Sequence, residues 1–207
     1  MKRTGLGIVI IFAVVGALVF SRLLANKDSE EAIEVFKDNI ATDKAEPTTN
    51  VDDKEAPPLR APKPELVNLD GWLQSDATGI NSFDGQVRIV QFWTFGCFNC
   101  NNTYPFLKEI YQTYEPEGLE IIGVHAPEFD WEKNPIDIQN AANEKGITWP
   151  IALDTNKENF KAWRPENRGW PLTYVLDQNG NVRYERKGEK DYERLTNTVK
   201  YLIENGP

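Results

Sequence analysis

Apolar runs divide the second half of the chain into strand-like and helix-like segments. Residues 87–93 form a continuous β-branched and aromatic run, which is typical of a buried central strand. From 97 to 114 apolar side chains recur at helical spacing. Residues 119–124 predict a second buried strand, and 134–145 predict a helix that ends at Gly146. This order of elements predicts a β-α-β-α unit of an α/β fold.

Further apolar segments complete the domain. They predict a third short strand, a helix, two more strands and an amphipathic C-terminal helix, at residues 150–154, 157–163, 173–177, 182–186 and 192–202. The turn at 178–181, between the last two strands, contains Asn179-Gly180, which is a strong hairpin signal. We therefore expect the chain to close with an antiparallel hairpin followed by a helix.

Residues 1–25 have the pattern of a membrane anchor or signal sequence. Lys2 and Arg3 precede an uncharged run over 5–20, and Leu23-Leu24-Ala25 extends it toward the roughly 20 residues that a membrane span needs. Signal cleavage sites usually carry small residues in the pattern A-x-A, but Leu23 stands at the first of these positions. We expect an uncleaved single-pass anchor in the cell (inner) membrane, with the rest of the chain outside the cytoplasm, in the periplasm of a two-membrane cell.

The region after the anchor changes composition at about residue 65. Residues 26–64 are rich in acidic residues and proline, which is the composition of a linker. Residues 65–207 contain all the Trp and Tyr residues and predict one globular domain. The linker would hold this domain away from the bilayer.

Charge and cysteine usage narrow the range of functions. The formal net charge of -9 argues against a nucleic-acid partner, because phosphate backbones attract basic surfaces. The chain has 2 cysteines, spaced C-x-x-C, which are too few and too close for the disulfide framework of a small secreted protein. They indicate a reactive pair.

The predicted elements place Cys97 and Cys100 where a strand runs into the start of a helix. A free thiol with a pKa of about 8.5 is only slightly ionised at neutral pH, and unpaired N–H groups at a helix start stabilise the thiolate. We expect Cys97 to attack and Cys100 to resolve, with no cofactor beyond their disulfide. An inert disulfide or half of a zinc site is the alternative, but zinc needs four ligands and His125 is the chain's single histidine.

Several motifs carry a resemblance to a known family. They are Gly71-Trp72-Leu73, the run from Phe92 to Cys100, Pro105, the stretch from Ile122 to Phe129, and Trp170-Pro171 with the strand after it. With them the chain resembles thioredoxin-like proteins, and more narrowly the membrane-anchored TlpA/ResA/DsbE group and the thioredoxin-like domain of DipZ-type proteins.

The resemblance implies a fold and an activity. The fold would be a mixed sheet of four or five strands flanked by helices, with an inserted β-α element between the active-site helix and the closing hairpin. The helix would be kinked by Pro105, and the Trp170-Pro171 peptide would be cis, facing the cysteines. The activity would be thiol-disulfide exchange with partner proteins, with a leaning toward reduction, often of apocytochrome c, using electrons from a membrane donor protein. Phe98-Asn99 between the cysteines does not fix the direction of electron flow.

The chain also departs from the family pattern at two positions. Thioredoxins carry a buried acid where this chain has Gln91, and ResA-like proteins often carry a glutamate where it has Thr103. Acid-base assistance must then come from water or another residue. Glu128 is the candidate, because it lies in the loop that ends a parallel strand.

Three aromatic or imidazole side chains remain to be assigned. We expect Trp93 and Trp170 to form walls of a substrate groove beside Pro171, although an aromatic residue next to a buried strand is often part of the core. His125 either stabilises a thiolate or packs at the end of its strand, and the second interpretation is favoured.

Two other functions are compatible with parts of the sequence. Thr94-Phe95-Gly96-Cys97 matches the T-x-x-C of peroxiredoxins, but the proline that these peroxidases need is replaced by Val90. A copper-handling module of similar fold would use two cysteines and a histidine as soft ligands. Such modules usually space the cysteines more widely and place the histidine later in the chain.

Overall fold

The computed structural model describes residues 56–60, 65–163 and 169–207, all within a compact unit that spans Asp52–Pro207. The predicted anchor at 1–25 and most of the linker at 26–64 lie outside the described residues. Within the described part of the chain, no helix is both long and apolar enough to cross a membrane.

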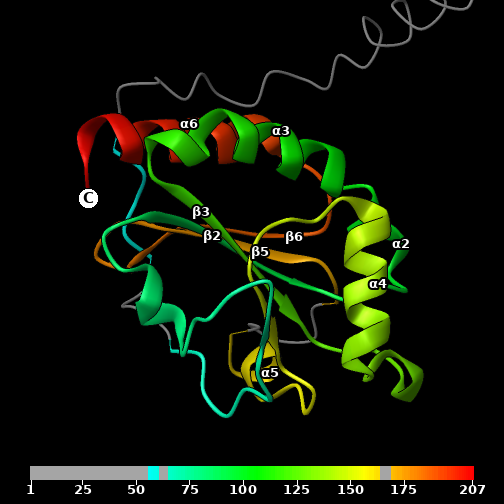
Figure 1. Ribbon diagram of the computed structural model, residues 1–207. Helices are drawn as coiled ribbons and strands as arrows, with labels where there is room; N and C mark the ends of the chain where they lie inside the picture. Colours follow the sequence, from blue (N-terminus) through cyan, green and yellow to red (C-terminus); the bar gives the residue numbers. More distant parts are fainter. Residues whose placement is uncertain (1–55, 61–64, 164–168) are drawn as a thin grey trace, which may run out of the picture. The chain divides into compact units, whose positions relative to one another are not determined.

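The core of the domain is one mixed sheet of six strands (Figure 1). The order across the sheet is β1-β4-β3-β2-β5-β6, in which β2, β3 and β4 are parallel while β1, β5 and β6 each run antiparallel to a neighbour. The bounds are Trp72–Leu73, Val87–Trp93, Leu119–His125, Ile151–Leu153, Leu172–Leu176 and Val182–Lys187 for β1 to β6. The expectation of four or five strands was wrong by one edge strand, because two residues are too few to show a periodicity.

The described residues also contain five helices and three short 3-10 turns. The helices are α2 at Phe98–Asn101, α3 at Tyr104–Tyr114, α4 at Pro135–Lys145, α5 at Glu158–Trp163 and α6 at Tyr192–Asn205. The 3-10 turns are η1 at Ile80–Phe83, η2 at Glu115–Glu117 and η3 at Asp130–Glu132. Apart from β1 and the first helix, these bounds confirm the predicted order of strands and helices.

The single helix predicted at 97–114 is in fact two helices. Helix α2 ends at Asn101, and α3 begins at Tyr104 with Pro105 in its first turn. Proline has no N–H to donate to the carbonyl four residues earlier, and its ring crowds that carbonyl. The Thr103 N–H instead donates to the Cys100 carbonyl at 3.0 Å, which tightens the turn between the two helices. The kink implied by Pro105 is therefore a break.

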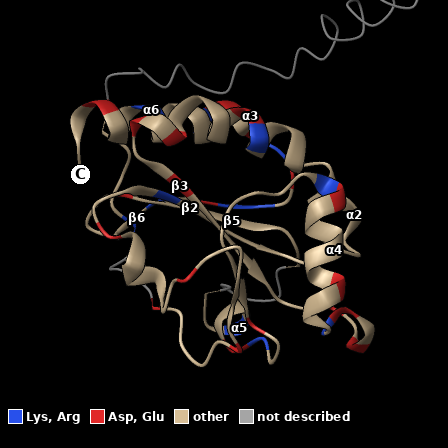
Figure 2. Ribbon diagram, viewed as in Figure 1, with Lys and Arg blue, Asp and Glu red and all other residues tan. Residues whose placement is uncertain are grey.

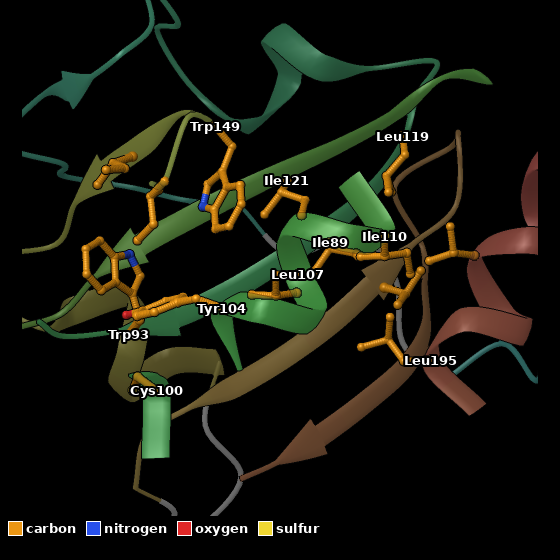
Figure 3. Packing of buried hydrophobic residues seen from close by; sticks show 14 of the residues in the cluster. Ile89, Trp93, Cys100, Tyr104, Leu107, Ile110, Leu119, Ile121, Trp149 and Leu195 are labelled. Atoms are coloured by element: carbon orange, nitrogen blue, oxygen red, sulfur yellow. The ribbon is translucent and has the colours of Figure 1, made fainter. Parts of the chain in front are cut away.

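Both faces of the sheet are covered, so β2 is buried along its whole length. Each face of the sheet carries a cluster of buried hydrophobic residues. Helices α3 and α6 pack together over the first cluster, while η1 and α5 contribute side chains to the second, on the other face (Figure 1). One end of the cluster under α3 and α6 contains Trp93, Tyr104 and Cys100, which lie together (Figure 3). A Cβ at Gly123 would lie 2.8 Å from the Trp93 Nε1 atom, so only glycine in β3 leaves room for the indole of Trp93 to lie against that strand.

The amino-terminal end of β2 is held by ionic and polar contacts. Arg88 is fully buried and donates to the Asp84 carboxylate at 2.9 Å and to the Asp177 carbonyl at 3.1 Å. Asp177 begins the turn between β5 and β6, where Asn179-Gly180 forms the predicted hairpin. Arg183 donates to the Asp177 carboxylate at 3.1 Å and to the Pro57 carbonyl at 2.8 Å. Elsewhere the charged residues lie mainly on helices and loops (Figure 2).

Candidate active site

The two cysteines lie at the carboxyl end of β2, where a short turn leads into α2. The Cys97 N–H donates to the Thr94 carbonyl at 3.2 Å, which closes this turn. Cys97 is the N-cap residue of α2 and forms a disulfide with Cys100, with the Cα atoms 5.3 Å apart. Cys97 is half-buried, whereas Cys100 is 0% exposed. A partner in solution can therefore contact Cys97 but not Cys100.

A backbone N–H group at the helix start faces the Cys97 sulfur. The Cys100 N–H donates to Cys97 Sγ at 3.2 Å. Because α2 spans only Phe98–Asn101, this direct contact replaces the dipole of the long helix expected from the sequence. A donor in this position favours the charged form of a sulfur more than the neutral form.

Gln91 and Thr103, the two departures from the family pattern, meet beneath Cys100. The Gln91 side-chain amide donates to Thr103 Oγ1 at 3.0 Å, and the Thr103 hydroxyl donates to the Cys100 carbonyl at 2.7 Å. All three residues are buried. The chain thus holds Cys100 with a neutral, hydrogen-bonded Gln91–Thr103 relay, where the thioredoxins that it resembles carry a buried acid.

The same row of the sheet continues with two further polar side chains. Gln91 pairs with Thr173 on β5, which pairs in turn with Arg186 on β6. Both are buried, and among the described residues Thr173 Oγ1 and the Nε and Nη1 atoms of Arg186 have no hydrogen-bond partner. Arg186 also lies over the Tyr192 ring at 4.7 Å. Neither residue carries a signal in the sequence, since each falls at an ordinary strand position.

Glu132 is the site residue that sequence reasoning missed. Its carboxylate is fully buried and accepts the Gly96 N–H at 3.1 Å, the Phe129 N–H at 2.9 Å and the Glu128 N–H. These contacts tie the residue before Cys97 to the loop after β3. Glu128, the predicted acid-base group, has an exposed side chain in this loop. A glutamate three residues after a helix start is a capping signal, but Phe129 is not a usual N-cap residue and so hid the pattern.

Trp93 belongs to the core, which corrects its expected place in the groove wall. It is 1% exposed, and its ring meets Tyr104 and His125 edge-on, at centroid distances of 5.9 and 5.1 Å. Its position at the end of β2 puts it on the side facing α3, where packing takes all of its surface. The alternative interpretation of an aromatic residue beside a buried strand is the correct one here.

His125 is also buried, at the end of β3. Its ring stacks on Phe95 at 5.7 Å, and Nε2 lies 3.4 Å from Thr94 Oγ1. Burial lowers the pKa of His125 to about 3, so its imidazole is neutral at physiological pH. The favoured expectation, that it packs at the strand end, agrees with this environment, and it has no positive charge to offer a thiolate.

Trp170 and Pro171 enter β5 beside the end of β2. Their peptide bond is cis, as the resemblance implied. Leu172 pairs with Phe92, so Pro171 lies next to the point where β2 leads toward the cysteines. Trp170 is half-buried and stacks on Phe160, with ring centroids 4.4 Å apart and planes inclined by 9°. The groove role of this pair stays a prediction.

Among the described residues, no group of three or more His, Cys, Asp and Glu side chains is arranged to hold a metal ion. His125 faces Thr94 and aromatic rings rather than a second ligand.

Known proteins that are similar to this chain include thiol-disulfide oxidoreductases, in agreement with the cysteine pair at the start of α2. Residues 54–185 match the AhpC/TSA family. The chain is 37% identical to Protein DipZ of Mycobacterium bovis over 143 residues, which cover 68% of this chain and 20% of DipZ. It is 28% identical to the thiol-disulfide oxidoreductase YkuV of Bacillus subtilis over 145 residues, covering 70% of this chain and 96% of YkuV.

A solved structure of an oxidised thioredoxin-like protein matches with a TM-score of 0.62 and 28% identity, covering 72% of this chain and 99% of that one. The chain spans about a fifth of the length of the DipZ protein it matches, since the matched part is 20% of DipZ. These similarities confirm the expected thioredoxin-like α/β fold and the resemblance to the family.

Proposed function

The chain belongs to the AhpC/TSA family, and we propose that, like the thiol-disulfide oxidoreductase YkuV to which it is similar, it exchanges disulfides with partner proteins through Cys97 and Cys100. One observation carries this proposal: a half-buried sulfur at a helix start is bonded to a fully buried one three residues later. Such a pair lets one sulfur meet the partner while the other waits within reach.

In the reductive direction the reaction begins with the reduced pair. The Cys97 thiolate attacks a partner disulfide, a bond forms between Cys97 Sγ and one partner sulfur, and the other partner sulfur leaves and takes up a proton. The Cys100 thiol then loses its proton and attacks Cys97 Sγ, which breaks the mixed disulfide and releases the second partner sulfur. The partner gains two electrons and two protons, and the protein is left with the Cys97–Cys100 disulfide. A dithiol donor protein must then reduce it.

Several residues would assist these steps. The Cys100 N–H stabilises charge on Cys97 Sγ, and the Gln91–Thr103 relay holds the Cys100 backbone in place. Glu128 is our candidate for proton transfer, since its exposed carboxylate can exchange protons with water. Trp170 and Pro171 would line the path of an extended partner segment.

The location and partners are also part of the proposal. The sequence pattern of residues 1–25 supports a single-pass anchor in the inner membrane, with 26–64 as a linker and 65–207 as the catalytic domain outside the cytoplasm. A membrane protein would supply electrons, and apocytochrome c is a candidate substrate. Labelling of Cys97 by a thiol reagent that cannot cross membranes, added to intact reduced cells, tests this placement, and protection from the reagent would contradict it.

The defining experiment is the reduction potential of the Cys97/Cys100 couple. The full chain, purified in mild detergent, is equilibrated with defined glutathione and dithiothreitol buffers and its free thiols are counted. A potential below about -230 mV supports a reductant of partner disulfides, whereas a value near -120 mV makes the protein a disulfide-forming oxidase. If the couple does not titrate, the proposed function fails. A rapid burst of oxidation by hydrogen peroxide would instead favour the peroxidase alternative.

A further inference from the structure

Three large aromatic side chains lie exposed around Cys97. Phe98, between the two cysteines, is 75% exposed, and Phe129 and Trp131 in the loop after β3 are 52% and 59% exposed. Single exposed apolar residues are ordinary, but exposed rings gathered beside a reactive group indicate a contact surface. We call these three residues the aromatic shelf.

Two rings of the shelf, Phe129 and Trp131, are ordered relative to residues 94–97, which we call the cysteine loop. Trp131 stacks parallel to Phe129 at 6.0 Å and meets Phe95 edge-on at 5.2 Å. A Cβ atom at position 96 would lie 2.8 Å from the Trp131 Cη2 atom. The Trp131 ring therefore rests directly against Gly96, the residue that precedes Cys97, and only glycine allows this approach.

Hydrogen bonds to a buried carboxylate tie the Phe129–Trp131 part of the shelf to the cysteine loop. The Glu132 carboxylate, next to Trp131 in the chain, accepts N–H groups from Gly96 on one side and from Glu128 and Phe129 on the other. A surface fixed in this way loses little conformational entropy when a partner binds, so more of the free energy of burying its exposed rings contributes to affinity.

We propose that the aromatic shelf docks an extended partner segment that carries a large apolar side chain within two residues of its reactive cysteine. This inference rests on the proposed function and names the substrate class that the site prefers. In the mixed disulfide the two sulfurs are about 2.05 Å apart, and residues of an extended chain advance by about 3.3 Å each. The neighbours of the partner cysteine must then lie over the neighbours of Cys97, where Phe98 and Trp131 present their rings.

The test uses two disulfide-linked peptides that differ only in the residue after cysteine, phenylalanine in one and serine in the other. Second-order rate constants are measured with the reduced full chain in detergent. We expect the wild type to prefer the phenylalanine peptide by about tenfold, the scale of a buried aromatic contact at an interface. Trp131→Ala and Phe129→Ala should each lower this preference below about threefold, and Trp131→Tyr should restore most of it.

The control is Leu59→Ala, which removes an apolar side chain that is 66% exposed at the opposite end of the sheet, next to Arg60 and its bond to Val182. It should keep the tenfold preference. Equal rates of the wild type with both peptides, or an unchanged preference in Trp131→Ala, would overturn the inference and leave the proposed function intact. Failure of the wild type to react with hydroxyethyl disulfide and with either peptide would instead remove the proposed function. If the wild type dimerises through the shelf and shows no preference, a second copy is the occupant and the inference is wrong.

Discussion

The two ends of the central strand β2 use buried charge for different purposes. At the amino end, Arg88 and Asp177 join β2 to the turn between β5 and β6, and the Asp177 carboxylate accepts the N–H groups of Asn179 and Asn181 at 3.0 and 2.8 Å. At the carboxyl end, Glu132 accepts backbone N–H groups from two loops. Each end thus has one buried carboxylate saturated by donors.

The surroundings of these carboxylates differ. Arg183 neutralises Asp177 at 3.1 Å, and the turn carries short polar side chains. Around Glu132 the neighbours are exposed aromatic rings and a half-buried sulfur. We therefore expect the buried carboxylate at the amino end to stabilise the domain. The buried carboxylate at the carboxyl end instead holds a reactive surface that partners can contact. Substitutions at the amino end should therefore change stability alone, whereas those at the carboxyl end should also change activity.

The largest effect should come from Cys97 and should concern activity. Cys97→Ser removes the attacking sulfur, so the reduction of peptide disulfides should fall by more than about 1000-fold. Cys100→Ser keeps the attacking sulfur but cannot resolve the mixed disulfide. It should accumulate a covalent complex with the peptide, which mass spectrometry detects. Comparable turnover by Cys97→Ser and the wild type would show that the carboxyl end of β2 is not the reactive end.

The largest loss of stability should come from the amino end. Asp177→Ala removes the carboxylate that accepts from Arg183 and from the backbone N–H groups of Asn179 and Asn181, and it should lower the free energy of unfolding by about 3 kcal/mol. Denaturant unfolding followed by tryptophan fluorescence measures this change. Asp76→Ala, at an exposed aspartate, is the matched control and should change stability by less than about 0.5 kcal/mol. The reduction potential of the Cys97/Cys100 couple should stay that of the wild type in both variants. A shift would show that the amino end of β2 also influences the cysteines at its carboxyl end.

Glu132 should affect stability and activity together, each to a smaller extent. In Glu132→Gln one carboxylate oxygen becomes an NH2 group, which cannot accept, so either the Gly96 N–H or the two loop N–H groups lose their acceptor. We expect a loss of about 2 kcal/mol in stability and about a tenfold slower reaction with peptide disulfides.

Glu128→Gln is the control within the same loop. Its side chain is exposed, so stability should change by less than about 0.5 kcal/mol. If Glu128 moves protons, the pH dependence of the reaction will change in this variant alone. A Glu132→Gln protein with wild-type stability and rate would show that the carboxylate does not organise the site.

Periodicity predicted those parts of the fold that packing alone determines. Strand β2 and helix α6 lie where their apolar patterns placed them, because each buries a face long enough to show its repeat. Strand β1 was missed because it has two residues, and the break before α3 was missed because apolar spacing continues across it. A local hydrogen-bond requirement at Pro105 outweighed the pattern.

The site was predicted where chemistry depends on residue type and missed where it depends on burial. Cys97 and Cys100 are identified by their spacing, but whether Glu128 or Glu132 is buried depends on how the loop after β3 folds back on Gly96. Trp93 was assigned to a groove because its sequence position adjoins the cysteines, although the alternation of side chains along β2 directs it into the core.

The smallest effect should be a pH dependence of stability at the carboxyl end. Burial lowers the pKa of His125 to about 3, below the value of about 6.5 expected in the unfolded chain. Between these values the unfolded chain binds a proton that the folded protein does not, so stability is complete above pH 6.5 and falls as the pH is lowered toward 3. At pH 5 the loss should be about 2 kcal/mol.

His125→Gln removes this titration while keeping a polar group near Thr94, and the comparison of the two proteins isolates it. Burial raises the pKa of Glu120 and Asp154, which acts in the opposite direction, but both carboxyl groups are present in wild type and variant and cancel in the difference. Denaturant unfolding at pH 7.5 and pH 5 should therefore show the wild type losing about 2 kcal/mol more than the variant. An equal loss in both proteins would mean that the imidazole becomes protonated in the folded state, and a buried cation beside the cysteine loop would then have to enter the account of thiolate stabilisation.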